Sequence, residues 1–128
     1  MLDDITIASI ESIAPYSGPH AIEGIRFRPA RQALGVTAWG MSVLELDPHC
    51  RGYPAHDHGA DGQEEVYVVL RGSAVLAVEG AERRLVAGEL VRVPPARTRH
   101  WRTEDEGVTL LALGATPGQA YDPNRGVA

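Results

Sequence analysis

Several features that mark common protein classes are missing from this 128-residue sequence. It has a single cysteine, Cys50, which cannot form a disulfide within the chain, so we expect a reducing, cytoplasmic location. No apolar run approaches the roughly 18 residues that cross a membrane. The acidic first residues lack the basic region of a signal peptide. Basic residues form no cluster, and the net charge of −5 argues against nucleic acid as a partner.

Helical periodicity is also scarce, and residues 9–14 are the only weak helix candidate. Apolar residues instead follow a period of two in short runs, which 14 glycines and nine prolines interrupt. The predicted strands cover residues 5–10, 25–28, 36–46, 53–58, 65–71, 73–79, 82–86, 89–93, 98–103 and 107–113. Residues 11–24 are expected to form a loop or arm. Many short strands with this punctuation favour an all-β sandwich or barrel.

A chain of this length is most naturally a single domain with its own core. We therefore expect one domain over residues 1–128. Within it, residues 1–30 form an N-terminal arm and strands, residues 36–113 form the barrel, and residues 114–128 form a polar tail.

The segment from Gly52 to Gly72 carries the strongest chemical signal. His56 and His58 lie two residues apart, so on an extended strand both imidazoles point to the same face. Metal ions bind such a pair, and a carboxylate from a neighbouring strand completes three sides of a site. A glutamate pair opens the apolar run that follows, and its members point to opposite faces of a strand. Only one of them can therefore share the site.

The order of these residues resembles the first motif of the cupin superfamily, and residues 88–100 (GELVRVPPARTRH) resemble its second motif. The likeness covers residues 36–113. It implies a double-stranded β-helix, a jelly-roll barrel whose lumen holds the site. It also implies a divalent metal ion, which the sequence leaves open among iron, manganese, zinc and nickel. The implied ligands are His56, His58, Glu65 and a histidine of the second motif.

Two assignments within this resemblance stay open. Motif spacing favours Glu65 over Glu64 as the carboxylate ligand. In the second motif, Arg99 occupies the position where the family carries its histidine, and His100 follows one residue later. A shift of one residue turns a strand side chain to the other face, so His100 becomes the fourth ligand only if a bulge near residues 96–98 restores the phase.

Three functions are compatible with such a site. The first is a metal-dependent enzyme that acts on a small molecule, as a dioxygenase, an isomerase or a decarboxylase. The second is a non-catalytic cupin that binds a small ligand as a sensor or storage protein. The third is a barrel with a degraded, metal-free site. The fold does not decide among them, and the sequence identifies no catalytic residue.

The run from Val36 to Leu46 is apolar on both faces. A strand in a small isolated barrel needs only its inner face apolar. We therefore expect a homodimer, in which the outer face packs on a second copy and the segment around Ile5–Ile10 adds a strand across the contact. The alternative is that residues 1–30 fold back and cover this face within one chain.

Overall fold

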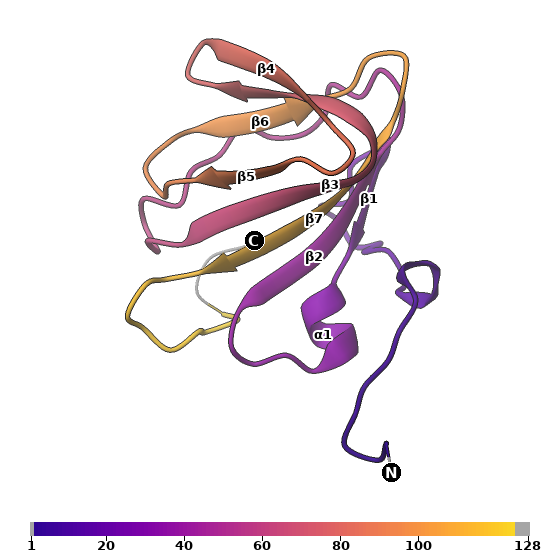
Figure 1. Cartoon of the computed structure of the whole chain (residues 1–128), viewed down its shortest axis with the longest axis vertical. Coiled ribbons are helices and arrows are strands. Elements are labelled where there is room, and N and C mark those ends of the chain that lie inside the picture. The colour runs from indigo at the N-terminus through magenta and orange to yellow at the C-terminus, as the bar shows by residue number, and fades with distance from the viewer. Residues whose placement is uncertain (1, 125–128) are drawn as a thin grey trace.

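The computed structural model describes residues 2–124, which form a small barrel of antiparallel strands (Figure 1). In chain order its elements are the 3-10 helix η1 (Ile10–Ser12), β1 (Ile25–Arg28), α1 (Ala30–Leu34), β2 (Gly40–Leu46), β3 (Glu64–Val78), β4 (Ala81–Val86), β5 (Leu90–Val93), β6 (Arg99–Arg102) and β7 (Val108–Ala115). One sheet has the order β1-β2-β7-β3-β5, and the second has the order β4-β3-β6. The predicted all-β jelly-roll barrel is confirmed.

Strand β3 belongs to both sheets. Its first half pairs with β5 and β7, and its second half pairs with β4 and β6. The two halves meet at Gly72, whose φ is 75°. A Cβ atom on Gly72 would lie 1.9 Å from the carbonyl oxygen of Gly107, so a larger residue does not fit there. The prediction of separate strands over 65–71 and 73–79 was therefore wrong, because the glycine bends one strand and does not end it.

Two further predicted strands are absent. Residues 5–9 are extended but belong to no strand, and η1 begins at Ile10. Residues 53–58 contain only a single bridge, between His56 and Arg99. An extended conformation without a continuous partner strand explains both errors, since alternation of side chains does not reveal which strand pairs with which.

The helix α1 was not predicted. Its five residues, ARQAL, are too few to show a helical period, although its end at Gly35, in the left-handed conformation with φ 74°, is a common helix terminus. Residues 35–39 connect α1 to β2, so the strand predicted from residue 36 begins only at Gly40. No helix within residues 2–124 is long and apolar enough to span a membrane.

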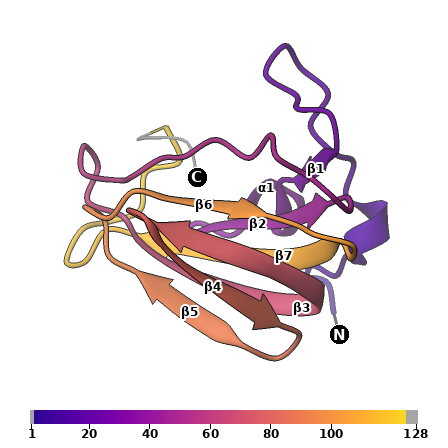
Figure 2. The same ribbon diagram turned by 90° about the horizontal axis from the view of Figure 1, so that it is seen from above.

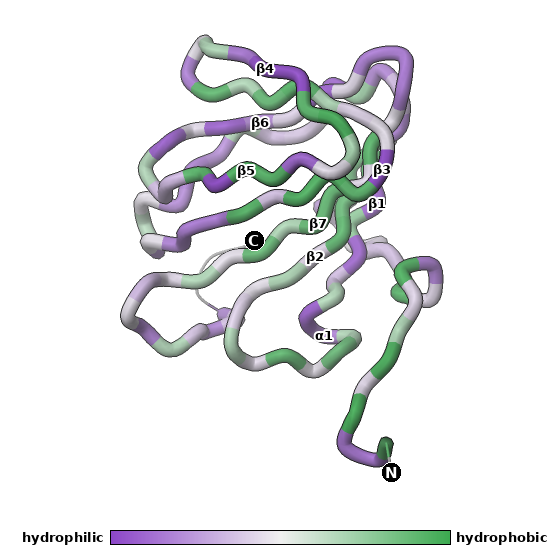
Figure 3. Tube along the Cα trace, in the orientation of Figure 1, coloured by the Kyte–Doolittle hydropathy of each residue, from purple (hydrophilic) through white to green (hydrophobic). Residues whose placement is uncertain are grey.

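The main core lies between the two sheets, where the inward side chains of successive strands meet; in Figure 3 apolar stretches run along these strands. Trp101 and Leu110 are fully buried there. A second, smaller cluster lies on the outer face of β2. Ile10, Ile13 and Ala30 pack against Val43 in this cluster. Part of the outer face is therefore covered by the N-terminal region of the same chain.

The remainder of this outer face is uncovered in the isolated chain. Leu70 of β3 and Leu90 of β5 are exposed, the latter by 67%. In the extended segment before η1, Ile5 and Ile7 are also exposed, the latter by 77%. Exposed apolar side chains on a sheet surface are typical of a surface that contacts another chain.

We propose that two chains associate through the exposed residues of β3 and β5, whereas part of the outer face of the Val36–Leu46 run, where the sequence placed the contact, is covered by residues of the same chain. Sedimentation at micromolar concentration should then give a species of about twice the 13.7 kDa chain mass. Leu90→Asp should shift the population to the monomer, because it places a charge in an apolar contact. Ala81→Asp, which adds the same charge at the exposed β3–β4 turn, should not. A single wild-type species at the chain mass would contradict the dimer.

Candidate metal centre

The two motif histidines lie on the long connection between β2 and β3. Figure 2 shows this connection on the side of the molecule opposite to β5. The backbone N–H of His56 donates to the carbonyl oxygen of Arg99 over 3.0 Å, and its carbonyl accepts from Arg99 N–H over 2.9 Å. The N–H of His58 donates to the carbonyl oxygen of Pro95 over 2.7 Å. These bonds fasten the loop to β6 and to the turn before it, and so fix where both imidazoles lie.

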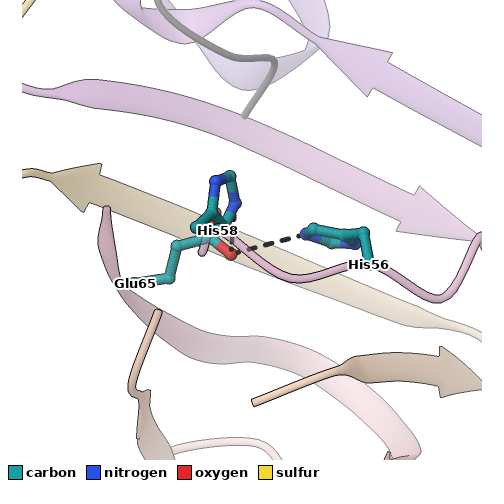
Figure 4. A group of neighbouring side chains, drawn as sticks. All are labelled: His56, His58 and Glu65. Carbon is teal, nitrogen blue, oxygen red and sulfur yellow. Dashed lines mark ion pairs between the residues drawn. The ribbon is translucent and has the colours of Figure 1, made fainter. Parts of the chain in front are cut away.

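The carboxylate comes from Glu65, the second residue of β3, which is only 2% exposed. The Nε2 atoms of His56 and His58 lie 3.7 Å and 3.3 Å from its Oε1 atom (Figure 4). One potential ligand atom from each of the three residues lies within 4.8 Å of the others. A single ion could therefore contact all three side chains.

Contacts on the far side of each ring favour metal binding at Nε2. Nδ1 of His56 faces the carbonyl oxygen of Pro54 at 3.3 Å, and Nδ1 of His58 faces both carboxylate oxygens of Asp61 at 3.2 Å. With a metal ion bound, a proton on Nδ1 would satisfy these acceptors and leave the Nε2 lone pair of each ring free to coordinate the ion beside Glu65. Among the described residues, the buried Nε2 of His58 has no hydrogen bond of normal geometry. Two imidazoles and one carboxylate in this arrangement fit a divalent transition metal ion.

Several donors surround the carboxylate of Glu65. The hydroxyl of Tyr67 donates to Oε1 over 2.8 Å, and Nη2 of Arg99 donates to the same atom over 3.0 Å. Burial alone would raise the pKa of Glu65, but the nearby rings of His56 and His58 and the hydrogen bond from Tyr67 hold this pKa far below its usual range. Glu65 therefore remains ionised inside the barrel.

The structure brings together three of the four expected ligands. Of the two glutamates, Glu65 is the one that lies beside the histidines. Glu64 pairs with Arg92 on the outer side of the sheet. His100 is not in the cluster. It is half-buried on the opposite face of β6.

The register of β6 explains where His100 lies. Arg99, His100 and Trp101 pair in sequence with consecutive residues of β3, so no bulge changes the phase between them. Arg99 and Trp101 are fully buried, which places the guanidinium in the lumen where the resemblance had implied an imidazole. A residue-type pattern cannot reveal this, because it does not fix the register.

Sequence reasoning missed two residues that support the cluster. Tyr67 lies two residues after Glu65 on the same strand, so the period of two could have placed its hydroxyl beside the carboxylate. Asp61 lies in the loop after His58, where no periodicity predicts the direction of a side chain.

Comparison with known proteins now establishes the relationship. The sequence model described as the cupin domain matches residues 42–114. This chain belongs to the cupin family. No curated protein matches this cupin at a significant level.

Solved structures with the same barrel include proteins of different activity. A sugar phosphate isomerase of the cupin superfamily, from Silicibacter pomeroyi, aligns with a TM-score of 0.69 and 20% identity, over 90% of this cupin and 75% of that chain. A predicted oxalate decarboxylase from Thermotoga maritima aligns with a TM-score of 0.67 and 17% identity, over 87% of this cupin and 99% of that chain. A DMSP lyase from Ruegeria pomeroyi aligns with a TM-score of 0.56 and 28% identity, over 66% of this cupin and 42% of that chain. At such identities these likenesses concern the fold.

Metal binding should depend on pH through His58. The carboxylate of Glu65, 3.3 Å from Nε2, raises the pKa of His58 against the effect of burial, and Asp61 adds to this effect. Below that raised pKa a metal ion must displace a proton from the ring, so affinity should rise by up to about tenfold per pH unit and level off above it. Calorimetry in buffers of different ionisation enthalpy should detect the released proton. Binding without proton release would contradict this assignment.

The carboxylate behind His58 can be tested by an isosteric change. Asp61→Asn keeps the oxygen that accepts the backbone N–H of Gln63 but removes the negative charge. We expect metal affinity to fall by roughly 10- to 100-fold, as is usual when such an outer partner is lost. The matched control is Asp57→Asn, at an exposed carboxylate in the same loop. Competition against a chelator measures both, and equal affinities in the two variants would exclude a supporting role for Asp61.

Proposed function

We propose that this cupin is a metal-dependent enzyme acting on a small molecule, with His56, His58 and Glu65 holding a divalent ion, preferably iron(II). The observation that carries the proposal is the convergence of two Nε2 atoms on one buried carboxylate, with both Nδ1 atoms already engaged. β6 contributes Arg99 to the lumen, and a guanidinium cannot serve as a fourth ligand. Three protein ligands leave coordination positions for exchangeable groups, the arrangement of non-haem iron oxygenases.

A dioxygenase-type reaction fits the other side chains better than isomerisation does. Isomerisation needs a base beside the metal, whereas the two imidazoles and Glu65 are assigned here as ligands. Burial raises the pKa of Tyr53 to about 12 and that of Tyr67 further, so neither phenol is a base near neutral pH. Bound iron(II) would supply adjoining positions for a small molecule and dioxygen.

The residues of the chain itself would prepare this site. Asp61 fixes the orientation of the His58 ring, and Tyr67 together with Arg99 fixes Glu65. The fully buried Trp101 packs edge-to-face against the Tyr67 ring, with ring centroids 5.3 Å apart. Such apolar walls exclude water from the reacting groups.

One observation favours a second candidate, a metal-free barrel that binds a small ligand. Arg99 and Glu65 form a buried ion pair at 3.0 Å, so the carboxylate already has a cationic partner without any metal. In that case the barrel would act as a sensor or storage module, and metal ions would not alter it.

Anaerobic reconstitution with iron(II) separates the two candidates. We expect one iron per chain, and nitric oxide, a probe for exchangeable positions, should give the EPR signal of an iron–nitrosyl centre. His58→Ala should lose both, whereas His100→Ala, at an outward residue of similar chemistry, should retain both. Oxygen uptake with a panel of small molecules would then identify the substrate. Absence of bound iron, or iron that nitric oxide cannot reach, would refute the enzyme proposal.

A further inference from the structure

Arg99 has more hydrogen-bonding capacity than the protein uses. Its side chain is fully buried, and a guanidinium offers five N–H donors. Nη2 donates to Glu65, and Nη1 donates to the carbonyl oxygen of Arg97 over 2.9 Å. Within residues 2–124, the buried Nε atom has no acceptor. A fully buried cation with an unfilled donor indicates an acceptor that is not part of the chain.

A second buried donor lies on the same face of β6. Trp101 is two residues from Arg99, so both side chains point inward. The indole Nε1–H of Trp101 is buried and lacks an acceptor in the described part of the chain. Trp101 contacts Tyr67, whose hydroxyl donates to Glu65, so one side chain separates the Trp101 ring from the candidate metal centre. A ligand of Arg99 must present an acceptor atom to its Nε–H donor.

The net charge of the site with a metal ion bound also indicates an anionic ligand. With both histidines neutral, the fixed charges are the carboxylates of Asp61 and Glu65 and the guanidinium of Arg99. A divalent ion would leave one excess positive charge in a buried volume. Burying a net charge is unfavourable unless an opposite charge accompanies it.

We propose that Arg99 anchors the carboxylate group of a small ligand beside the metal centre, and that this carboxylate and the divalent ion strengthen each other's binding. The inference rests on the proposed function, and it names the substrate class as small carboxylates. A carboxylate carries one negative charge and supplies two acceptor oxygens. Phosphate carries between about 1.5 and 2 charges near neutral pH, more than the single excess charge requires.

The test measures the dissociation constant of zinc(II), which is redox-inert, by chelator competition at constant ionic strength. Separate titrations contain sodium acetate, sodium phosphate or sodium chloride. Acetate should tighten zinc binding by a factor within the roughly 5- to 150-fold range of usual coupling between sites. Phosphate and chloride should have little effect. Acetate also complexes free zinc, which would weaken apparent binding, so tightening cannot arise in solution.

Variants assign the effect to the guanidinium. Arg99→Gln should bind zinc but lose the response to acetate. Arg99→Lys, which keeps a charge beside Glu65 but lacks the planar guanidinium, should lose most of the acetate response. The matched control is Arg97→Gln, since the Arg97 side chain is exposed and pairs with Glu79. It should respond like the wild type. Circular dichroism of the zinc-loaded variants verifies the fold, and the wild-type titrations stand without them.

The outcomes separate the two proposals. Zinc binding that ignores acetate in the wild-type protein overturns the carboxylate inference and leaves the metal centre intact. Tightening by phosphate but not by acetate also overturns it, in favour of a tetrahedral anion. An acetate response that survives in Arg99→Gln removes Arg99 from the anion site. Failure to bind zinc or iron under every condition overturns the proposed function instead.

Discussion

Strand β3 has fifteen residues and hydrogen-bonds with four other strands, so the position of nearly every part of the barrel is defined relative to it. The close approach of Gly72 to the Gly107 carbonyl makes this possible, because it lets one strand turn from the first sheet into the second. Glu65 lies on the half of β3 before the bend, and the strands that line the lumen pair on both sides of it. The same bend that closes the barrel therefore encloses the carboxylate.

A buried carboxylate constrains the residues around it, since an unpaired charge in a protein interior is strongly unfavourable. Here four side chains from three separate segments approach a single oxygen of Glu65: His56 and His58 from the loop, Tyr67 from β3 and Arg99 from β6. The loop, β3 and β6 are thus joined through one atom as well as through backbone hydrogen bonds. Electrostatics and barrel closure depend on each other in this region.

Much of the barrel could be predicted from sequence because its strands are short, alternate in polarity and end at glycine or proline. The prediction failed where local pattern carries no information about partners. Gly72 looks like a terminator although it is a bend, and the helix α1 is too short to show a period. At the site, the resemblance to the cupin motif grouped His56, His58 and Glu65, and these three side chains lie together in the structure. The sequence left open whether Arg99 or His100 points inward, because the answer depends on the register of β6 with β3.

The Arg99–Glu65 ion pair also bears on whether the chain needs a metal ion in order to fold. In small zinc domains the metal is needed for folding, so synthesis of the folded form waits for the ion. In this cupin the buried carboxylate receives a cationic partner from its own chain as soon as β3 and β6 come together. A newly made chain can therefore close its barrel during a shortage of metal. Under the proposed function, metal loading and folding would be separate steps, and the supply of metal ions would control only the loading.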